Sequence, residues 1–126
     1  MGEIRIAIAD DSSAFLAAAS DYVARLPGYV IAGTAAHASQ AAALVRNAVP
    51  DVLLLDLGPA PARGLDAVRA LNAVPGAPAV VAMTLFHSPE AAAAARRAGA
   101  VGLIGKDAFV SGLTQILAAL FPAKAA

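Results

Sequence analysis

Short apolar segments recur along the chain, separated by longer stretches with helical periodicity. The strongest lie at residues 4–9, 52–55, 79–83 and 101–104, and a weaker one at residues 29–35 is interrupted by Gly33. Each segment is too short for a buried helix. Runs of this length that are rich in Val, Ile or Leu are typical of strands covered on both faces. The pattern therefore predicts a buried parallel sheet.

Between these segments, apolar residues recur with the period of an amphipathic helix. The predicted helices are one that starts at Ser12 or Ser13 and ends at Pro27, one over residues 39–48, one that follows Gly64 and closes at Pro75, one that starts at Ser88 and ends at Gly99, and one over residues 109–120. Alternating strands and helices imply parallel strands joined by right-handed crossovers. We predict an α/β fold, a (βα)5 doubly wound five-stranded parallel sheet.

A polar residue follows each of the four strong apolar segments. Asp10 and Asp11 follow the first, Asp56 the second, Thr84 the third, and Lys106 comes just after the fourth. In open parallel sheets, ligands bind outside the carboxyl ends of the strands. We expect these five residues to converge on one site.

Composition limits the function that such a site can have. The 126 residues are 60% hydrophobic, enough for one domain with a proper core, and nine basic residues cancel nine acidic ones. Nucleic-acid binding through this domain and membrane binding are therefore not expected. The absence of cysteine excludes disulfides and thiolate metal sites. With no secretory signal or membrane-spanning run in the sequence, a cytoplasmic protein is expected.

Three carboxylates in one pocket repel one another, and a cation relieves the repulsion. The candidate ligands are all oxygen atoms, which favours a hard ion such as Mg²⁺ over Zn²⁺. A carboxylate, a hydroxyl, an ammonium group and a divalent ion together form a phosphoryl-transfer site, in which an aspartate can act as the nucleophile.

Four segments resemble motifs of the response-regulator receiver domains of two-component signalling systems, in the same order and spacing. They are Asp10-Asp11, residues 51–56 with Gly64 eight positions after Asp56, residues 80–84 ending at Thr84, and residues 98–106 ending at Lys106. The resemblance covers essentially the whole chain. It implies the flavodoxin-like strand order 2-1-3-4-5, a receiver domain over residues 1–121, and a C-terminal tail or the start of a linker over residues 122–126.

The resemblance also implies a role for each site residue. Asp56 would accept a phosphoryl group from a sensor histidine kinase or a phosphotransfer protein. Lys106 would pair with that group, and Thr84 would move to hydrogen-bond it and switch the face formed by the fourth helix, fifth strand and fifth helix. The implied ligands of Mg²⁺ are Asp11, Asp56, the carbonyl group of Gly58, and Asp10 through water.

The sequence departs from the family pattern at four positions. Pro59 comes one place earlier than the usual proline, and Asp107 replaces the proline that usually follows the lysine. Leu103 stands where an aromatic switch residue is usual, and Leu85 replaces a small residue after the threonine. These departures leave open a degenerate receiver that acts only as an interaction module.

Two further expectations concern activity and assembly. We expect no enzymatic activity other than the protein's catalysis of its own phosphorylation and dephosphorylation. A haloacid-dehalogenase-like phosphatase is the alternative, although Asp56-Leu57-Gly58 lacks the second acid of that family's motif. Residues 109–121 carry no charge, which predicts weak homodimerisation through the fifth helix with the first or the fourth. The chain is also expected to be the N-terminal part of a longer transcriptional regulator.

Residues outside the constellation receive simpler interpretations. His37 and His87 are expected to be solvated loop residues, and Asp107 to cap the last helix.

Overall fold

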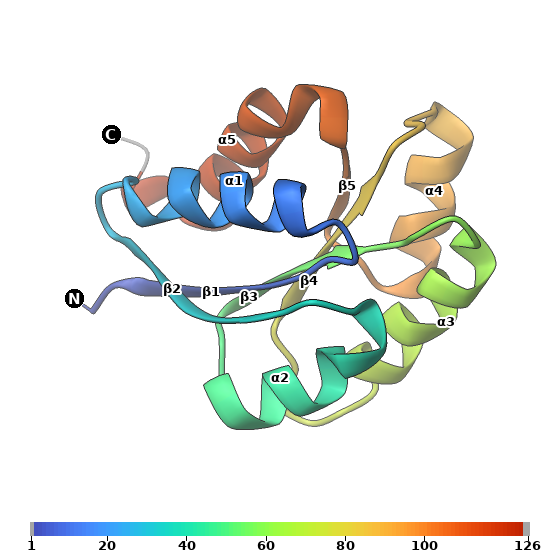
Figure 1. Ribbon diagram of the computed structural model, residues 1–126, viewed down its shortest axis with the longest axis horizontal. Helices are drawn as coiled ribbons and strands as arrows, with labels where there is room; N and C mark the ends of the chain where they lie inside the picture. Colours follow the sequence, from blue (N-terminus) through green and yellow to red (C-terminus); the bar gives the residue numbers. More distant parts are fainter. Residues whose placement is uncertain (1, 125–126) are drawn as a thin grey trace.

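The computed structural model describes residues 2–124, which form a central sheet with helices on both faces (Figure 1). The strands are β1 (Ile4–Ala9), β2 (Tyr29–Ala35), β3 (Val52–Asp56), β4 (Ala79–Thr84) and β5 (Gly102–Gly105). The helices are α1 (Ser13–Ala24), α2 (Ala41–Ala48), α3 (Pro61–Asn72), α4 (Pro89–Ala98) and α5 (Phe109–Leu120). Three short 3₁₀ helices are η1 (Ala38–Gln40), η2 (Lys106–Ala108) and η3 (Pro122–Lys124).

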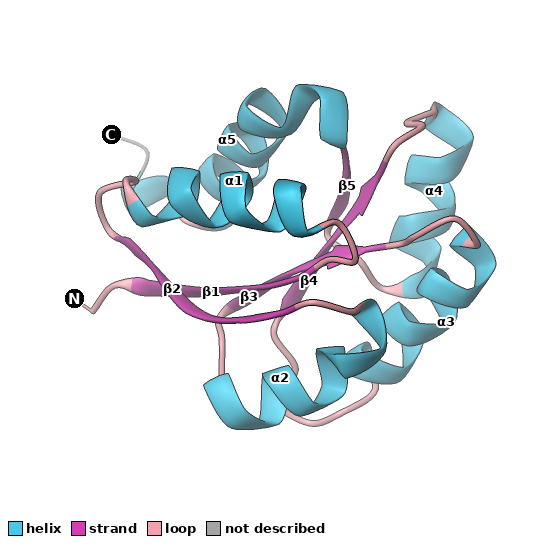
Figure 2. Ribbon diagram, in the orientation of Figure 1, coloured by secondary structure: helices cyan, strands magenta, loops and turns pink. Residues whose placement is uncertain are grey.

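All strand pairs are parallel, and the order is β2-β1-β3-β4-β5. The coloured elements show α1 and α5 on one face of the sheet and α2, α3 and α4 on the other (Figure 2). The predicted doubly wound (βα)5 fold and its strand order are therefore confirmed.

Alternate residues of each strand supply two separate cores. On one face, Ile8, Leu54 and Met83 pack against α1 and α5. On the other, Leu53 and Leu55 pack against α2, α3 and α4. The strands are apolar on both sides because both faces are covered, as the continuous apolar runs in the sequence indicate.

Several boundaries differ from those predicted. Helix α2 begins at Ala41, two residues later than expected, because residues 38–40 form a 3₁₀ turn instead. Helix α3 begins at Pro61 and not after Gly64, which lies inside the helix. Proline fits this start because the first helical N–H has no partner within the helix. Strand β5 begins and ends one residue later than predicted.

Helix starts were otherwise predicted well. Ser12 caps α1 by accepting a hydrogen bond from the backbone N–H of Phe15 at 3.2 Å. Ser88 caps α4, with Pro89 at its first position. Asp107 was wrongly expected to cap α5, whose N-cap residue is Ala108 and has no side-chain hydrogen bond.

The expected tail, residues 122–126, lies partly outside the described residues. Residues 122–124 form η3, which follows α5 directly, and residues 125–126 are not described. Over residues 2–124, no helix is both long and apolar enough to cross a bilayer.

Candidate functional site

The carboxyl ends of the strands bring the predicted residues together. A cavity of about 570 Å³ is lined by Asp11, Asp56, Gly58, Thr84 and Lys106. Its remaining walls are mostly apolar and consist of Ser12, Leu57, Pro59, Pro61, Leu85, Phe86 and Ala91. Parallel strands end at the same edge, so the fold alone gathers side chains that lie far apart in sequence.

Lys106 is the centre of the charged network. Its Nζ lies 2.9 Å from Oδ2 of Asp10 and 3.2 Å from Oδ1 of Asp56. All three side chains are at least 90% buried. Buried ion pairs contribute little net stability, but removing one partner leaves an uncompensated charge. The arrangement holds one ammonium group against the carboxylate of Asp56.

Asp10 lies beneath the cavity and does not line it. Its carboxylate is fully buried and accepts hydrogen bonds from Lys106 Nζ at 3.1 Å and from the backbone N–H of Ser12 at 2.8 Å. Burial raises the pKa of Asp10 above its ordinary value, opposed by the hydrogen bond from Lys106. The immediate partner of Asp10 is therefore the ammonium group.

Asp56, the last residue of β3, is held by backbone N–H groups of two different loops. The N–H of Gly58 donates to its Oδ1 at 3.1 Å, and the N–H of Asp11 lies 3.5 Å from its Oδ2. Gly58 has a φ of +72°, which residues other than glycine rarely adopt. The turn at Gly58 therefore folds the loop over the carboxylate.

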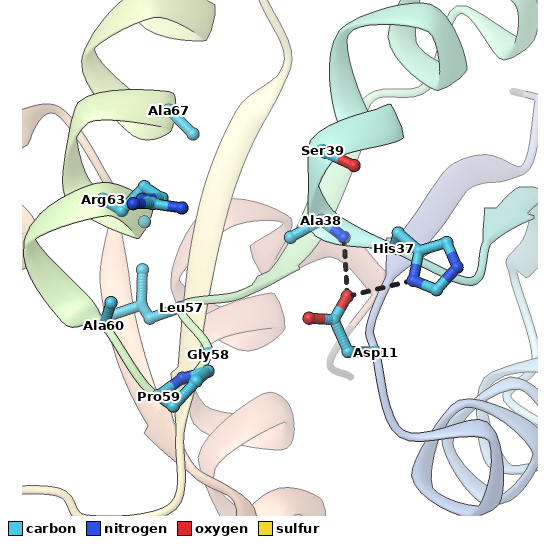
Figure 3. A pocket seen from close by; sticks show the side chains of 11 residues that line it. Asp11, His37, Ala38, Ser39, Leu57, Gly58, Pro59, Ala60, Arg63 and Ala67 are labelled. Atoms are coloured by element: carbon cyan, nitrogen blue, oxygen red, sulfur yellow. Dashed lines mark hydrogen bonds and ion pairs between the residues drawn. The ribbon is translucent and has the colours of Figure 1, made fainter.

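Asp11 is exposed and turns towards the loop after β2 (Figure 3). Its Oδ1 accepts a hydrogen bond from the backbone N–H of Ala38 at 2.9 Å and lies 3.7 Å from Nδ1 of His37. A second cavity of about 420 Å³ lies between this loop and the start of α3, with Arg63 across from His37.

His37 and Arg63 are thus neighbours of the site that sequence reasoning missed. His37 is solvent-exposed, as expected, but it contacts a candidate metal ligand. A signal for it exists in the sequence, since His37 follows β2 closely and β2 ends at the same edge of the sheet.

The oxygen ligands at this site suit Mg²⁺, which needs few protein ligands, better than a metal ion that must be enclosed by several side chains. Within residues 2–124, no three Asp, Glu, His or Cys side chains are grouped as a preformed metal site. Magnesium, however, keeps several water ligands and needs only one or two carboxylates together with phosphate oxygens. Asp11, Asp56 and Gly58 border one cavity and offer oxygen ligands of this kind.

Thr84 lies at the end of β4, and its hydroxyl group accepts a hydrogen bond from the backbone N–H of Phe86 at 3.3 Å. The next two side chains, Leu85 and Phe86, are 68% and 84% exposed at the cavity wall. The peptide bond between Lys106 and Asp107 is trans, like every other peptide bond of residues 2–124.

Comparisons with known proteins agree with this geometry. Residues 6–118 match the family model described as response regulator receiver domain. The chain is 32% identical over 112 residues to a protein-glutamate methylesterase/protein-glutamine glutaminase of Anaeromyxobacter dehalogenans, covering 89% of this chain and 33% of that protein. The match therefore spans about a third of that relative's length.

Two solved structures extend the comparison. A LuxR-family two-component response regulator from Aurantimonas sp. SI85-9A1 is 29% identical, with a TM-score of 0.77 over 94% of this chain and 87% of that one. The CheX-CheY-BeF3-Mg complex from Borrelia burgdorferi contains a chain with the same fold, 19% identical, with a TM-score of 0.78 over 94% of this chain and 89% of that one. With a family model that covers most of its length, the chain belongs to the response-regulator receiver domains of two-component signalling.

Proposed function

We propose that this domain is a phosphorylation switch in which Asp56 is the phosphoacceptor. The observation that carries the proposal is the position of the Lys106 ammonium group, 3.2 Å from Asp56 in a cavity that Thr84 also lines. A cation fixed beside the nucleophile stabilises the negative charge on a phosphoryl group during transfer. The donor is a phosphohistidine of a sensor histidine kinase or a phosphotransfer protein.

In this reaction, a carboxylate oxygen of Asp56 attacks phosphorus, and the bond between phosphorus and the histidine nitrogen breaks. The electron pair of that bond leaves with the imidazole, which then takes up a proton. The ammonium group of Lys106 pairs with the phosphoryl oxygens once they are attached to Asp56. Thr84 donates a hydrogen bond to them from its hydroxyl group. Asp10 keeps the ammonium group in place from below.

Asp11, Asp56 and the carbonyl group of Gly58 would hold Mg²⁺, and Asp10, which does not line the cavity, would reach the ion only through an intervening water. The ion would neutralise charge between the carboxylates and the phosphoryl oxygens. The Borrelia burgdorferi complex, with its BeF3 and Mg²⁺, supports this assignment by analogy of fold. Asp11 must then release Ala38 or share its carboxylate between the loop and the ion.

The output of the whole protein is a separate proposal. We infer a longer cytoplasmic response regulator in which phosphorylation switches the face formed by α4, β5 and α5. The LuxR-family neighbour favours the transcriptional output expected from sequence, whereas the methylesterase relative favours a chemotaxis regulator. The chain spans only the receiver part of that relative, so the methylesterase chemistry is not assigned to these residues.

Weak homodimerisation through α5, with α1 or α4, also remains part of the proposal. The exposed residues of α5 are Val110, Ser111, Thr114, Gln115 and Ala119, none of them charged. Sedimentation velocity with and without beryllofluoride would measure dimer formation, and a monomer in both conditions would contradict the proposed dimer.

The decisive experiment is intact-protein mass spectrometry after incubation with Mg²⁺ and acetyl phosphate. We expect one added phosphoryl group in the wild type and in Asp66→Asn, which changes an exposed aspartate on α3, but none in Asp56→Asn. No gain in the wild type, or an equal gain in Asp56→Asn, would contradict the assignment.

The same preparations distinguish the alternatives. A degenerate receiver would leave the NMR shifts of Asp11 and Asp56 unchanged when Mg²⁺ is added. A phosphatase of the haloacid-dehalogenase type would turn over a generic phosphomonoester.

A further inference from the structure

The ammonium group of Lys106 has an aromatic neighbour as well as its two carboxylates. Its Nζ lies over the ring of Phe15, 4.6 Å from the ring centroid. A cation within about 6 Å of an aromatic face is attracted to it, most strongly where water is excluded. The Lys106 side chain is only 9% exposed, so its contact with Phe15 is largely shielded from water.

The ring of Phe15 is itself held in place. Phe109, the first residue of α5, meets it edge-on, with centroids 5.3 Å apart and planes at 84°. Tyr22, two turns further along α1, meets Phe109 at 6.1 Å and 77°. These three side chains join α1 to the start of α5, on the face where both helices cover the sheet (Figure 1).

A single 3₁₀ turn connects the two contacts that Phe15 makes. Helix η2 runs from Lys106 to Ala108, and α5 begins at Phe109. Lys106 and Phe109 therefore stand at the two ends of one short turn, and both touch the same ring. A shift of the ammonium group towards a phosphoryl oxygen would change its position over Phe15 and, through this turn, the packing of Phe109.

On the other face of the sheet, β5 contributes Leu103 and no aromatic residue. Leu103 is 8% exposed and packs in the core beneath α3 and α4. As an aliphatic side chain, it has no polar atom to respond to a charge at Asp56 and no quadrupole to hold a cation.

We propose that Phe15 is a positioning residue for Lys106 and that this contact couples the charge at Asp56 to the packing of α1 against α5. The inference rests on the proposed phosphorylation of Asp56. It gives this chain a readout on the α1–α5 face in addition to the face formed by α4, β5 and α5.

The test compares Phe15→Leu with two matched variants. Phe15→Tyr keeps the aromatic face, and Tyr22→Leu removes a ring from the same cluster without touching Lys106. With acetyl phosphate and Mg²⁺, we expect the phosphorylation rate of Phe15→Leu to fall about tenfold, while the other two stay within about twofold of wild type.

The second readout is the NMR response to beryllofluoride with Mg²⁺. In the wild type, we expect beryllofluoride to change the amide shifts of Val110 and Ser111 at the start of α5, and we expect Phe15→Leu to lose these changes. The changes at Leu85 and Phe86, beside Thr84, should persist in Phe15→Leu. If Phe15 had a purely structural role, Phe15→Leu would lose the beryllofluoride response of both pairs of amides. Phe15→Tyr would then keep neither response.

Three outcomes would overturn the inference. They are an unchanged phosphorylation rate in Phe15→Leu, an equal fall of the rate in Phe15→Tyr, and a response of the Val110 and Ser111 amides to beryllofluoride in Phe15→Leu that is as large as in the wild type. Failure of the wild type itself to gain a phosphoryl group would instead overturn the proposed function.

Discussion

Replacing Gly64 by alanine should destabilise the domain, although the same change usually stabilises a helix. Alanine in place of an interior helical glycine contributes about 1 kcal/mol. At Gly64, however, a Cβ atom would lie 2.8 Å from both Cα and the carbonyl oxygen of Leu57, and 2.9 Å from its Cδ2. Two of these atoms are backbone, so no side-chain rotation relieves the crowding.

The size of the effect follows from these contacts. Forcing a methyl group into a packed interior costs about 1–3 kcal/mol, and rigid backbone neighbours favour the upper end. Subtracting the helical gain of about 1 kcal/mol leaves a net loss of about 2 kcal/mol in the free energy of unfolding. For a domain of this size, that loss lowers the melting temperature by roughly 7 °C.

Urea unfolding of Gly64→Ala against Gly112→Ala would measure the difference. In Gly112→Ala, on α5, the new Cβ meets only side-chain atoms of Ile104, the nearest at 3.1 Å. That side chain can adjust, so we expect a stability within about 1 kcal/mol of wild type. If Gly64→Ala proves as stable as Gly112→Ala, the argument from backbone contact is wrong.

Three further predictions use the same unfolding assay. Val49→Gly should raise stability by about 1 kcal/mol, because Val49 has a φ of +47° and is 70% exposed; a loss would show that its side chain matters more than its backbone. Lys106→Met should cost about 3 kcal/mol at pH 7 by leaving Asp10 buried without its partner, and Asp10→Asn in the same chain should recover most of it. Burial raises the pKa of Tyr29, so the folded state keeps a proton that the unfolded state loses above about pH 10. Stability should therefore fall as the pH rises past that value, and less steeply in Tyr29→Phe.

The apolar pattern was sufficient for a layered parallel sheet because both of its faces are apolar, whereas the strand order was predicted only from the family resemblance. Runs such as residues 52–55 have no solvent face and are too short for a buried helix, and the two features together indicate buried parallel strands. The start of α3 was missed for a local reason. Pro59 and Pro61 look like a loop, and Gly64 looks like a helix boundary, yet Pro61 is the first helical residue.

The convergence of the site was also predictable, but its internal pairing was not. Strand ends placed Asp56, Thr84 and Lys106 at one edge of the sheet. Which carboxylate meets the ammonium group, and which turns to Ala38, depends on loop geometry. The contact of Phe15 with Lys106 joins α1 to η2, and a residue on an apolar helix face gives no sign of such a contact.

The separation of Asp10 and Lys106 by 96 positions has a consequence during protein synthesis. A ribosome-bound chain that has completed β1 to β4 already carries Asp56, yet it lacks Lys106, the cation that pairs with this carboxylate. Under the proposed function, such a growing chain would gain a complete site only once β5 had left the ribosome and paired with β4 at the edge of the sheet. For the proposed phosphoacceptor, the completion of β5 and Lys106 would therefore set the earliest moment of phosphorylation.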